Sequence, residues 1–304
     1  MSDSKKPSSQ EPDGLFPTAG EDLISAAIPE ATLQTRSNAF RLAYDDVAFL
    51  LRDELRPVRL QLELLKPELL LQEQEVDATV VVFGSARVSE AERADELLAA
   101  AEEAAREAPG NLDTQRALSV AKRLAAKSRY YGQARRLGEL IGSHKVEEKS
   151  LQLVVVTGGG PGIMEAANRG AADAGAKSIG LNIVLPEEQT PNPYITPELC
   201  FQFHYFALRK MHFLMRARAL VVFPGGFGTL DELFDALTLI QTGKIRPMPV
   251  ILVGRDYWQR VIDFQFLAHE GVIHDEDLAL FDYAEDAEEA WDIICRYYDH
   301  QPEC

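Results

Sequence analysis

Cysteine is scarce in this sequence, which contains only Cys200, Cys295 and Cys304. The three are widely spaced, and no C-x-x-C pair occurs. A disulfide framework needs an even set of cysteines and a zinc knuckle needs paired ones, so neither is indicated. The cysteine content therefore predicts a protein of a reducing compartment, the cytoplasm.

Positive charge is also in deficit, since 31 Lys and Arg residues face 48 Asp and Glu residues, for a net charge of −17. A protein with a large net negative charge does not attract nucleic acid or anionic lipid over its whole surface. No run of 18 apolar residues occurs, and the start, MSDSKKPSSQEPDG, lacks the apolar core of a signal peptide. We expect no nucleic-acid partner and no membrane partner, and an anionic substrate would need a local positive site.

What the sequence does contain is the composition of a globular protein, with 46% hydrophobic and 26% charged residues. Its first residues are rich in Ser, Pro, Lys and Glu with little to bury, which is typical of disorder. A helical pattern follows, which Pro57 and Pro67 are expected to divide into two or three helices. The predicted parts are a disordered tail (1–20), a helical extension (21–78) and an α/β domain (79–304) with a helical insertion near 109–150.

The second half of the chain alternates short apolar runs with helical patterns. The helix before Gly243, for example, has Leu230, Leu233, Leu237 and Ile240 on one face. Strands that alternate with such helices are typical of βαβ units, which form a parallel sheet covered on both faces. The sequence therefore predicts an α/β fold with a doubly wound, Rossmann-like parallel sheet. Its expected strands are 79–83, 153–157, 178–184, 201–205, 219–223, 250–253 and, more weakly, 278–281.

Glycine-rich turns follow three of these strands, at residues 84–86, 158–162 and 224–229. The carboxyl ends of parallel strands lie at one edge of the sheet, where open α/β folds bind ligands, so we expect the turns to meet there. Glycines let the backbone approach a ligand, and free N–H groups at a helix N-terminus hold an anion such as phosphate. One such turn is equally consistent with a tight βα loop, but three together favour a binding site.

Two common nucleotide-binding motifs are nevertheless absent. From Gly158 and Gly160, the third position of G-x-G-x-x-G is Ile163. The glycine spacing within residues 170–178 is near that of a P-loop, but the lysine is one place too late and the segment closes a helix. Neither an NAD site nor ATP hydrolysis of the P-loop type is favoured.

Charged residues lie close to the third turn in the sequence. Thr229 and Glu232 match S/T-x-x-E, so they form either a capping box or a site in which Thr229 holds a phosphate and Glu232 faces the cleft. Arg209 and Lys210 are either solvated or the positive group of that site. A cation and a carboxylate that converge at one sheet edge would suit cleavage of a phosphorylated sugar.

Three stretches resemble the motifs of the LONELY GUY (LOG) family of phosphoribohydrolases, long labelled lysine decarboxylases. They are TGGGPGIME at 157–165, the pair Arg209-Lys210, and PGGFGTLDE at 224–232. The last matches P-G-G-x-G-T-x-x-E at every specified position. The resemblance covers roughly residues 79–254, and 178–194 looks like the longer bacterial branch of the family.

The resemblance implies a reaction and a set of site residues. Enzymes of this family cut the N-glycosidic bond of nucleoside 5′-monophosphates, including cytokinin ribotides, and release the free base and ribose 5-phosphate. The implied catalytic residues are Arg209 and Glu232. The residues expected to bind phosphate or other parts of the substrate are Ser85, Gly158, Gly159, Gly160, Gly162, Met164, Lys210, Gly225, Gly226, Gly228 and Thr229. The resemblance implies no metal and no cofactor, and a homodimer or an assembly of dimers.

Three other functions are weighed against this one. A pyridoxal phosphate decarboxylase needs a Schiff-base lysine, and nothing around Lys210 or Lys244 singles one out. A nucleotide carrier could use the same fold without turnover, although phosphate binding alone needs no carboxylate like Glu232. A regulatory interaction protein would depend on the acidic C-terminal part and the N-terminal helices. The sequence does not choose the base of the substrate.

Overall fold

The computed structural model describes residues 16–26, 31–144, 152–186 and 190–299. Residues 1–15 of the expected tail lie outside this description. The chain divides into two compact units, Met1–Leu62 and Glu63–Cys304. Within the described ranges, no helix is both long and apolar enough to cross a membrane.

The first unit consists of short helices. It contains α1 (Ala19–Ser25), capped by Thr18, then α2 (Val47–Leu50) and the start of α3 (Arg56–Glu73). The expected break at Pro67 is wrong, because α3 continues through this buried residue. Pro57 stands in the first turn of α3, where a missing N–H group costs nothing. Two 3₁₀ turns, Asn38–Phe40 and Asp53–Leu55, complete the unit.

The second unit is built on a seven-stranded sheet in which every neighbouring pair is parallel, in the order β4-β3-β2-β1-β5-β6-β7. The chain builds the sheet outward from β1 to β4, then crosses to the other side of β1 and continues through β7. The predicted doubly wound α/β fold is confirmed. The strands are β1 (Ala78–Phe83), β2 (Leu153–Thr157), β3 (Ser178–Ile183), β4 (Cys200–Phe203), β5 (Ala217–Val222), β6 (Val250–Val253) and β7 (Asp282–Ala284).

Two hydrophobic cores lie on opposite faces of this sheet. Along β1, Val80 and Val82 point into one core, and Val81 and Phe83 point into the other, as the two-residue period of a strand requires. The first core is covered by α6 (Arg129–Ser143), α7 (Ile163–Asp173) and α12 (Ala287–Asp299). The second is covered by α8 (Phe206–Met215), α9 (Phe227–Gln241), α10 (Arg255–Val261), α11 (Phe264–His269) and the second half of α3.

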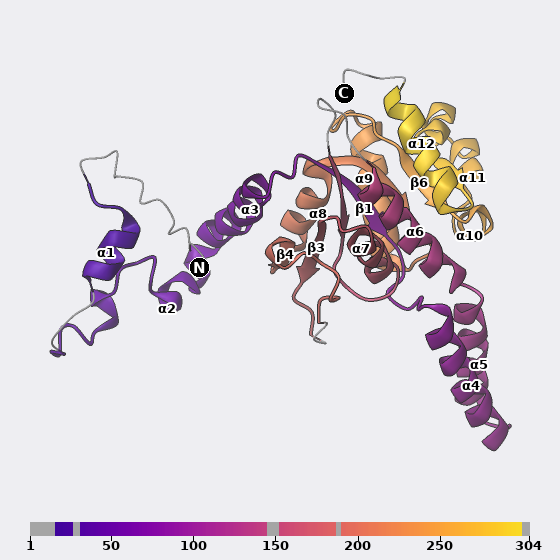
Figure 1. Ribbon diagram of the computed structural model, residues 1–304, viewed down its shortest axis with the longest axis horizontal. Helices are drawn as coiled ribbons and strands as arrows, with labels where there is room; N and C mark the ends of the chain where they lie inside the picture. The colour runs from indigo at the N-terminus through magenta and orange to yellow at the C-terminus, as the bar shows by residue number, and fades with distance from the viewer. Residues whose placement is uncertain (1–15, 27–30, 145–151, 187–189, 300–304) are drawn as a thin grey trace, which may run out of the picture. The chain divides into compact units, whose positions relative to one another are not determined.

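The helices α4 (Ala91–Glu107) and α5 (Leu112–Ala125) pack against each other as an antiparallel pair (Figure 1). The sequence predicts a break at Pro109 and Gly110, and the turn between the two helices lies there. Their sequence neighbour α6 behaves differently, because it packs on α7 and buries Leu137 and Ile141. Only α6, of these three helices, therefore contributes several residues to the core beneath the sheet.

Glycines bring α6 and α7 into backbone contact. A methyl group on Gly170 of α7 would overlap the carbonyl oxygen of Arg135 on α6. A methyl group on Gly138 of α6 would likewise overlap the carbonyl oxygen of Ala167 on α7. The two helices are therefore held at a separation that no larger residue allows at either position.

Two expectations near the end of the chain are wrong. The sequence predicts one helix around residues 257–267, but the structure has two, α10 and α11, because the Asp263 carboxylate accepts the Phe266 N–H at 2.9 Å and caps a new helix. The weak strand expected at 278–281 lies later, as β7. The first half of the expected stretch belongs to a 3₁₀ helix, Asp275–Ala279, in which Asp277 accepts the N–H of His274.

Candidate active site

The three glycine-rich turns meet at the carboxyl edge of the sheet, where the chain crosses from one side of β1 to the other. The N–H of Ser85 donates to the Pro224 carbonyl at 3.0 Å, which joins the first turn to the third. The N–H of Ile163 donates to the Ser85 carbonyl at 3.2 Å, which joins the second turn to the first. The side chain of Ser85 is used locally, since its Oγ accepts the Arg87 N–H at 3.1 Å. Ser85 therefore links the turns through its backbone.

A buried polar network fixes the second turn. Thr157 Oγ1 accepts the N–H of Gly159 at 3.0 Å and donates to Asn168 Oδ1 at 2.7 Å. The Asn192 side-chain amide donates to the carbonyls of Gly159 and Gly160, both at 3.2 Å, and to Asn168 Oδ1 at 3.0 Å. The turn is held by side chains from β2, α7 and the segment after β3, so it is rigid before any ligand binds.

Neither Asn168 nor Asn192 is among the residues that the sequence predicts at the site. The sequence feature that could have identified Asn168 is that it is the one polar residue on a helix face that otherwise carries Ala, Gly and Ile. Asn192 lies more than 20 residues away in the sequence, so its contact with Asn168 has no local pattern.

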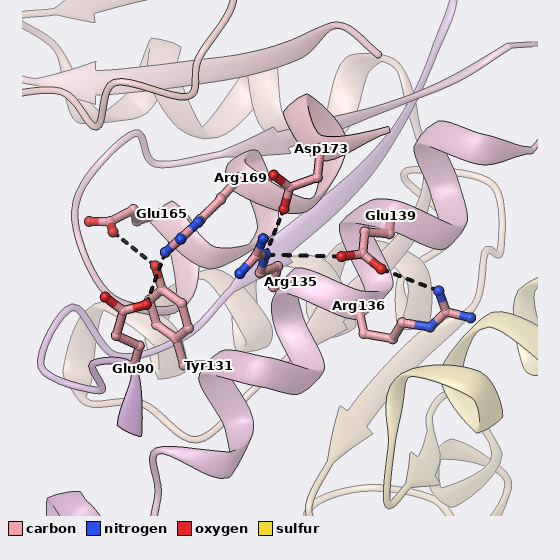
Figure 2. A network of polar contacts seen from close by, with 8 residues as sticks. All are labelled: Glu90, Tyr131, Arg135, Arg136, Glu139, Glu165, Arg169 and Asp173. Atoms are coloured by element: carbon pink, nitrogen blue, oxygen red, sulfur yellow. Dashed lines mark hydrogen bonds and ion pairs between the residues drawn. The ribbon is translucent and has the colours of Figure 1, made fainter. Parts of the chain in front are cut away.

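A second set of polar contacts joins α7 to neighbouring elements, as Figure 2 shows. Tyr131 Oη on α6 donates to Glu165 Oε1 at 2.9 Å, and Arg169 pairs with Glu90 at 2.9 Å. Burial raises the pKa of the Tyr131 hydroxyl to about 12, so it stays a donor at neutral pH. Farther along α7, Arg135 of α6 pairs with Asp173 at 2.6 Å. Glu165, the last residue of the TGGGPGIME stretch, thus anchors the helix that follows the turn.

Neither of the helices that follow the second and third turns is capped by a side chain. The N-cap of α7 is Gly162 and the N-cap of α9 is Gly226, and no side chain bonds to the first N–H groups at either position. By contrast, α5 and α11 are capped by Asn111 and Asp263. The uncapped N–H groups of α7 and α9, with the positive ends of the helix dipoles, form an arrangement suited to an anion.

Glycine is required at Gly162 for two reasons. Its φ is +74°, a conformation that L side chains rarely adopt, and a methyl group there would overlap the carbonyl oxygen of Ser85. Gly226 and Gly228 differ, since a methyl group at either would meet no atom within 4 Å. The third turn is therefore open on the side where Gly226 and Gly228 lie.

Arg209 extends from α8 to the second turn. Its Nε donates to the Leu181 carbonyl at 2.7 Å, and its guanidinium lies 5.1 Å from the centre of the Phe213 ring. A methyl group on Gly158 would lie 2.7 Å from Arg209 Nη2 and 2.9 Å from Met164 Sδ. The structure therefore brings Arg209, Gly158 and Met164 together. Burial lowers the pKa of Arg209, while the Glu232 carboxylate raises it.

Glu232 is a buried carboxyl group on α9, with 9% of its surface exposed. Burial raises its pKa to about 7, against the opposing effect of the positive charges of Arg209 and Lys210. Within the described residues, the Glu232 carboxylate has no ion pair closer than 4 Å. Lys210 is instead paired with Asp231 at 2.7 Å. A perturbed carboxyl group near a partly buried guanidinium is typical of a functional site.

The alternative in which Thr229 and Glu232 form a capping box is wrong. The helix α9 begins at Phe227, three residues earlier than this alternative requires, so both residues lie inside it. Thr229 is buried, and its side chain lies against the Gly225 backbone. The Gly225 carbonyl also accepts a hydrogen bond from Tyr257 Oη on α10. Glu232 therefore has no capping role that would explain a buried carboxylate.

Replacing Glu232 by Gln is expected to stabilise the protein at high pH. Its pKa is about 7 in the folded state, against an ordinary value of 4.5, so between these pH values the folded state retains a proton that the unfolded state has lost. The free energy of unfolding thus falls as pH rises through this window, by up to about 3 kcal/mol for this one group. Urea unfolding should show a larger gain for Glu232→Gln at pH 8.5 than at pH 5.5. An equal gain at both pH values would contradict the raised pKa.

Known proteins resemble parts of this chain. A protein-family model described as "Possible lysine decarboxylase" matches residues 164–294. The pyrimidine/purine nucleotide 5′-monophosphate nucleosidase of Escherichia coli K12 is 32% identical over 155 residues, which cover 46% of this chain and 31% of that protein. A cytokinin riboside 5′-monophosphate phosphoribohydrolase of Arabidopsis thaliana is 29% identical over 141 residues, which cover 45% of this chain and 61% of that protein. The resemblance to the LOG family is confirmed.

The match to these LOG-family relatives is partial, since it spans about a third of the bacterial nucleosidase and less than two thirds of the plant enzyme. Among solved structures, the molybdenum cofactor carrier protein of Chlamydomonas reinhardtii aligns with 73% of this chain and 99% of its own, at 18% identity and a TM-score of 0.45. The molybdenum cofactor binding protein of Rippkaea orientalis aligns with 55% of this chain and 87% of its own, at 20% identity and a TM-score of 0.38. With scores this low, superposition establishes no shared function.

Proposed function

We propose that this LOG-family relative hydrolyses the N-glycosidic bond of nucleoside 5′-monophosphates to the free base and ribose 5-phosphate. The observation that carries the proposal is the buried Glu232 carboxyl group, whose pKa is influenced by the positive charges of Arg209 and Lys210. It lies at the edge of the sheet where α7 and α9 begin without side-chain caps. The reaction named for the bacterial and plant relatives is consistent with this site.

Two regions of the proposed site have separate roles: the glycine turns bind the phosphate, and Glu232 acts on the bond that breaks. The 5′-phosphate binds the glycine turns at residues 158–162 and 225–229, where the N–H groups of two helices supply positive potential without a mobile cation. This binding places C1′ of the ribose by Glu232. A phosphate held at a distance from the reacting bond lowers the entropic cost of orienting it.

The carboxylate acts on the charge that develops as the bond breaks. The bond between C1′ and the base nitrogen breaks with its electron pair going to the base, so positive charge builds on the ribose and is stabilised by Glu232. Water adds its hydroxyl to C1′, and its proton goes to the departing base. Glu232 orients or deprotonates this water, since a pKa of about 7 suits a general base at neutral pH. Arg209 fixes the substrate or supports the departing base.

The direct test is an assay of the purified protein against AMP, GMP, CMP, UMP and a cytokinin ribotide. Released base is measured by chromatography and ribose 5-phosphate by a coupled assay. The proposal requires equal amounts of both products from at least one nucleotide. A nucleotide that binds but yields no base would instead support the carrier alternative.

A homodimer is the expected assembly. Apolar side chains on α8 and at the start of α9 are exposed, with Phe227 at 91%, Phe206 at 52% and Met211 at 48%. Light scattering should give the mass of two chains or a multiple of it, and Phe206→Glu with Met211→Glu should shift the protein towards monomer. Leu112→Glu, a change of an exposed residue on α5, should not. A wild-type monomer at micromolar concentration would contradict this expectation.

A further inference from the structure

A cavity of about 670 Å³ lies between α10 and the region where α5 ends and α6 begins. We call it the basic pocket. The residues that line it are Arg123, Ala126, Lys127, Arg129, Tyr130, Asp256, Tyr257, Arg260 and Val261. None of them belongs to the catalytic pair or to the glycine turns. The two sites meet at Tyr257, whose hydroxyl donates to the Gly225 carbonyl of the third turn.

The charge of this pocket is opposite to that of the protein. Four basic side chains and one acidic side chain line it, in a chain with a net charge of −17. Within the described residues, none of the four cations has a carboxylate within ion-pair distance. Arg123, Arg129 and Arg260 are exposed, so their positive charge is open to a ligand from solvent.

The cations are close enough to affect one another. Burial, and then the positive charges of Arg123 and Arg260, lower the pKa of Lys127. Arg123 and Arg260 come from different helices, α5 and α10, so they converge on Lys127 from two sides. Arg129 lies over the Tyr130 ring at 4.7 Å and donates to its hydroxyl at 2.9 Å, which orients a further guanidinium. Like charges this close repel one another, and a bound anion would reduce that repulsion.

We propose that the basic pocket binds a small ligand that carries a chain of phosphate groups. Several phosphates match four cations better than one does, because each phosphate accepts charge-assisted hydrogen bonds from its own partner. The cavity has the volume typical of small-molecule sites, which favours a compact ligand over a nucleic acid. The rest of the protein also repels an extended polyanion.

The test compares binding to two doubly substituted proteins of equal charge. Calorimetry of the full chain with sodium tripolyphosphate should show binding that weakens at least about tenfold in Arg123→Gln/Arg260→Gln, because two charge-assisted contacts are lost. The control, Arg116→Gln/Lys122→Gln, changes two exposed cations of α5 outside the pocket and should stay within about twofold of wild type. No binding to wild type, or equal weakening in both variants, would overturn the proposal.

Further titrations separate this site from the catalytic one and identify the ligand. Saturating AMP should leave tripolyphosphate binding in place, whereas competition would assign tripolyphosphate to the glycine turns and overturn the proposal. ATP that binds at least as tightly as tripolyphosphate supports a nucleotide as the source of the phosphate chain, and weaker binding of ATP supports an inorganic polyphosphate. Calorimetry requires no turnover, so failure of the proposed hydrolysis would leave this result intact.

Discussion

Replacing Glu232 by Gln is expected to lower kcat for nucleoside monophosphate hydrolysis at least about 100-fold, because the amide keeps the shape of the side chain and removes the charge that opposes the developing cation. The substrate should still bind, since the phosphate contacts come from the turns. The measurement is the rate of base release at saturating AMP, with calorimetric binding of AMP as the second readout.

The matched control for this change is Asp235→Asn. Asp235 lies about one turn further along α9 than Glu232, so the substitution removes one charge from the same helix. Its kcat should stay within a few-fold of wild type. Wild-type kcat/KM should also rise with pH through about 7 as Glu232 loses its proton, and Glu232→Gln should lack this rise. A near-normal rate for Glu232→Gln would remove Glu232 from the mechanism.

Adenosine is expected to be a poorer substrate than AMP by at least about 100-fold in kcat/KM. Without the 5′-phosphate, nothing holds C1′ at Glu232, so both binding and orientation are lost. Ribose 5-phosphate and inorganic phosphate should compete with AMP. Comparable values of kcat/KM for adenosine and AMP would mean that the turns are structural loops.

Gly228→Ala provides a sharper form of this test. Gly228 lies in the first turn of α9, and an added methyl group meets no atom within 4 Å, so the helix should fold at least as well. The methyl group would occupy the open side of the third turn and should lower kcat/KM for AMP while leaving that for adenosine unchanged. Gly132→Ala, at an exposed glycine of α6 that is equally open, should change neither value.

Sequence patterns predicted the bounds of two strands correctly. The bounds of β2 and β6 agree with the expected 153–157 and 250–253, because each strand is a short apolar run, and glycine follows both. The division between α10 and α11 was missed, since no Gly or Pro marks it and Asp263 becomes a cap only in the folded chain. The three turns were expected to meet, and the backbone hydrogen bonds of Ser85 join them.

The parts of the site that could not be predicted depend on contacts distant in sequence. Asn192 reaches Asn168 across 24 positions, and Tyr257 reaches Gly225 across 32. The basic pocket likewise lies between α5 and α10, which are distant in sequence, and no local sequence motif predicts it. The roles of Arg209 and Glu232 remain predictions from the family resemblance, to which the structure adds burial and a raised pKa for Glu232.

The glycine contacts between α6 and α7 limit how this protein can diverge during evolution. At Gly138 and Gly170 the opposing atoms belong to the backbone, so a larger residue cannot be accommodated by exchanging a neighbouring side chain. Substitutions at the surface of either helix therefore leave the separation of α6 and α7 unchanged. The position of the turn that precedes α7 is then unchanged as well. Under the proposed function, new substrate preferences would have to arise from the side chains around that turn, such as Met164.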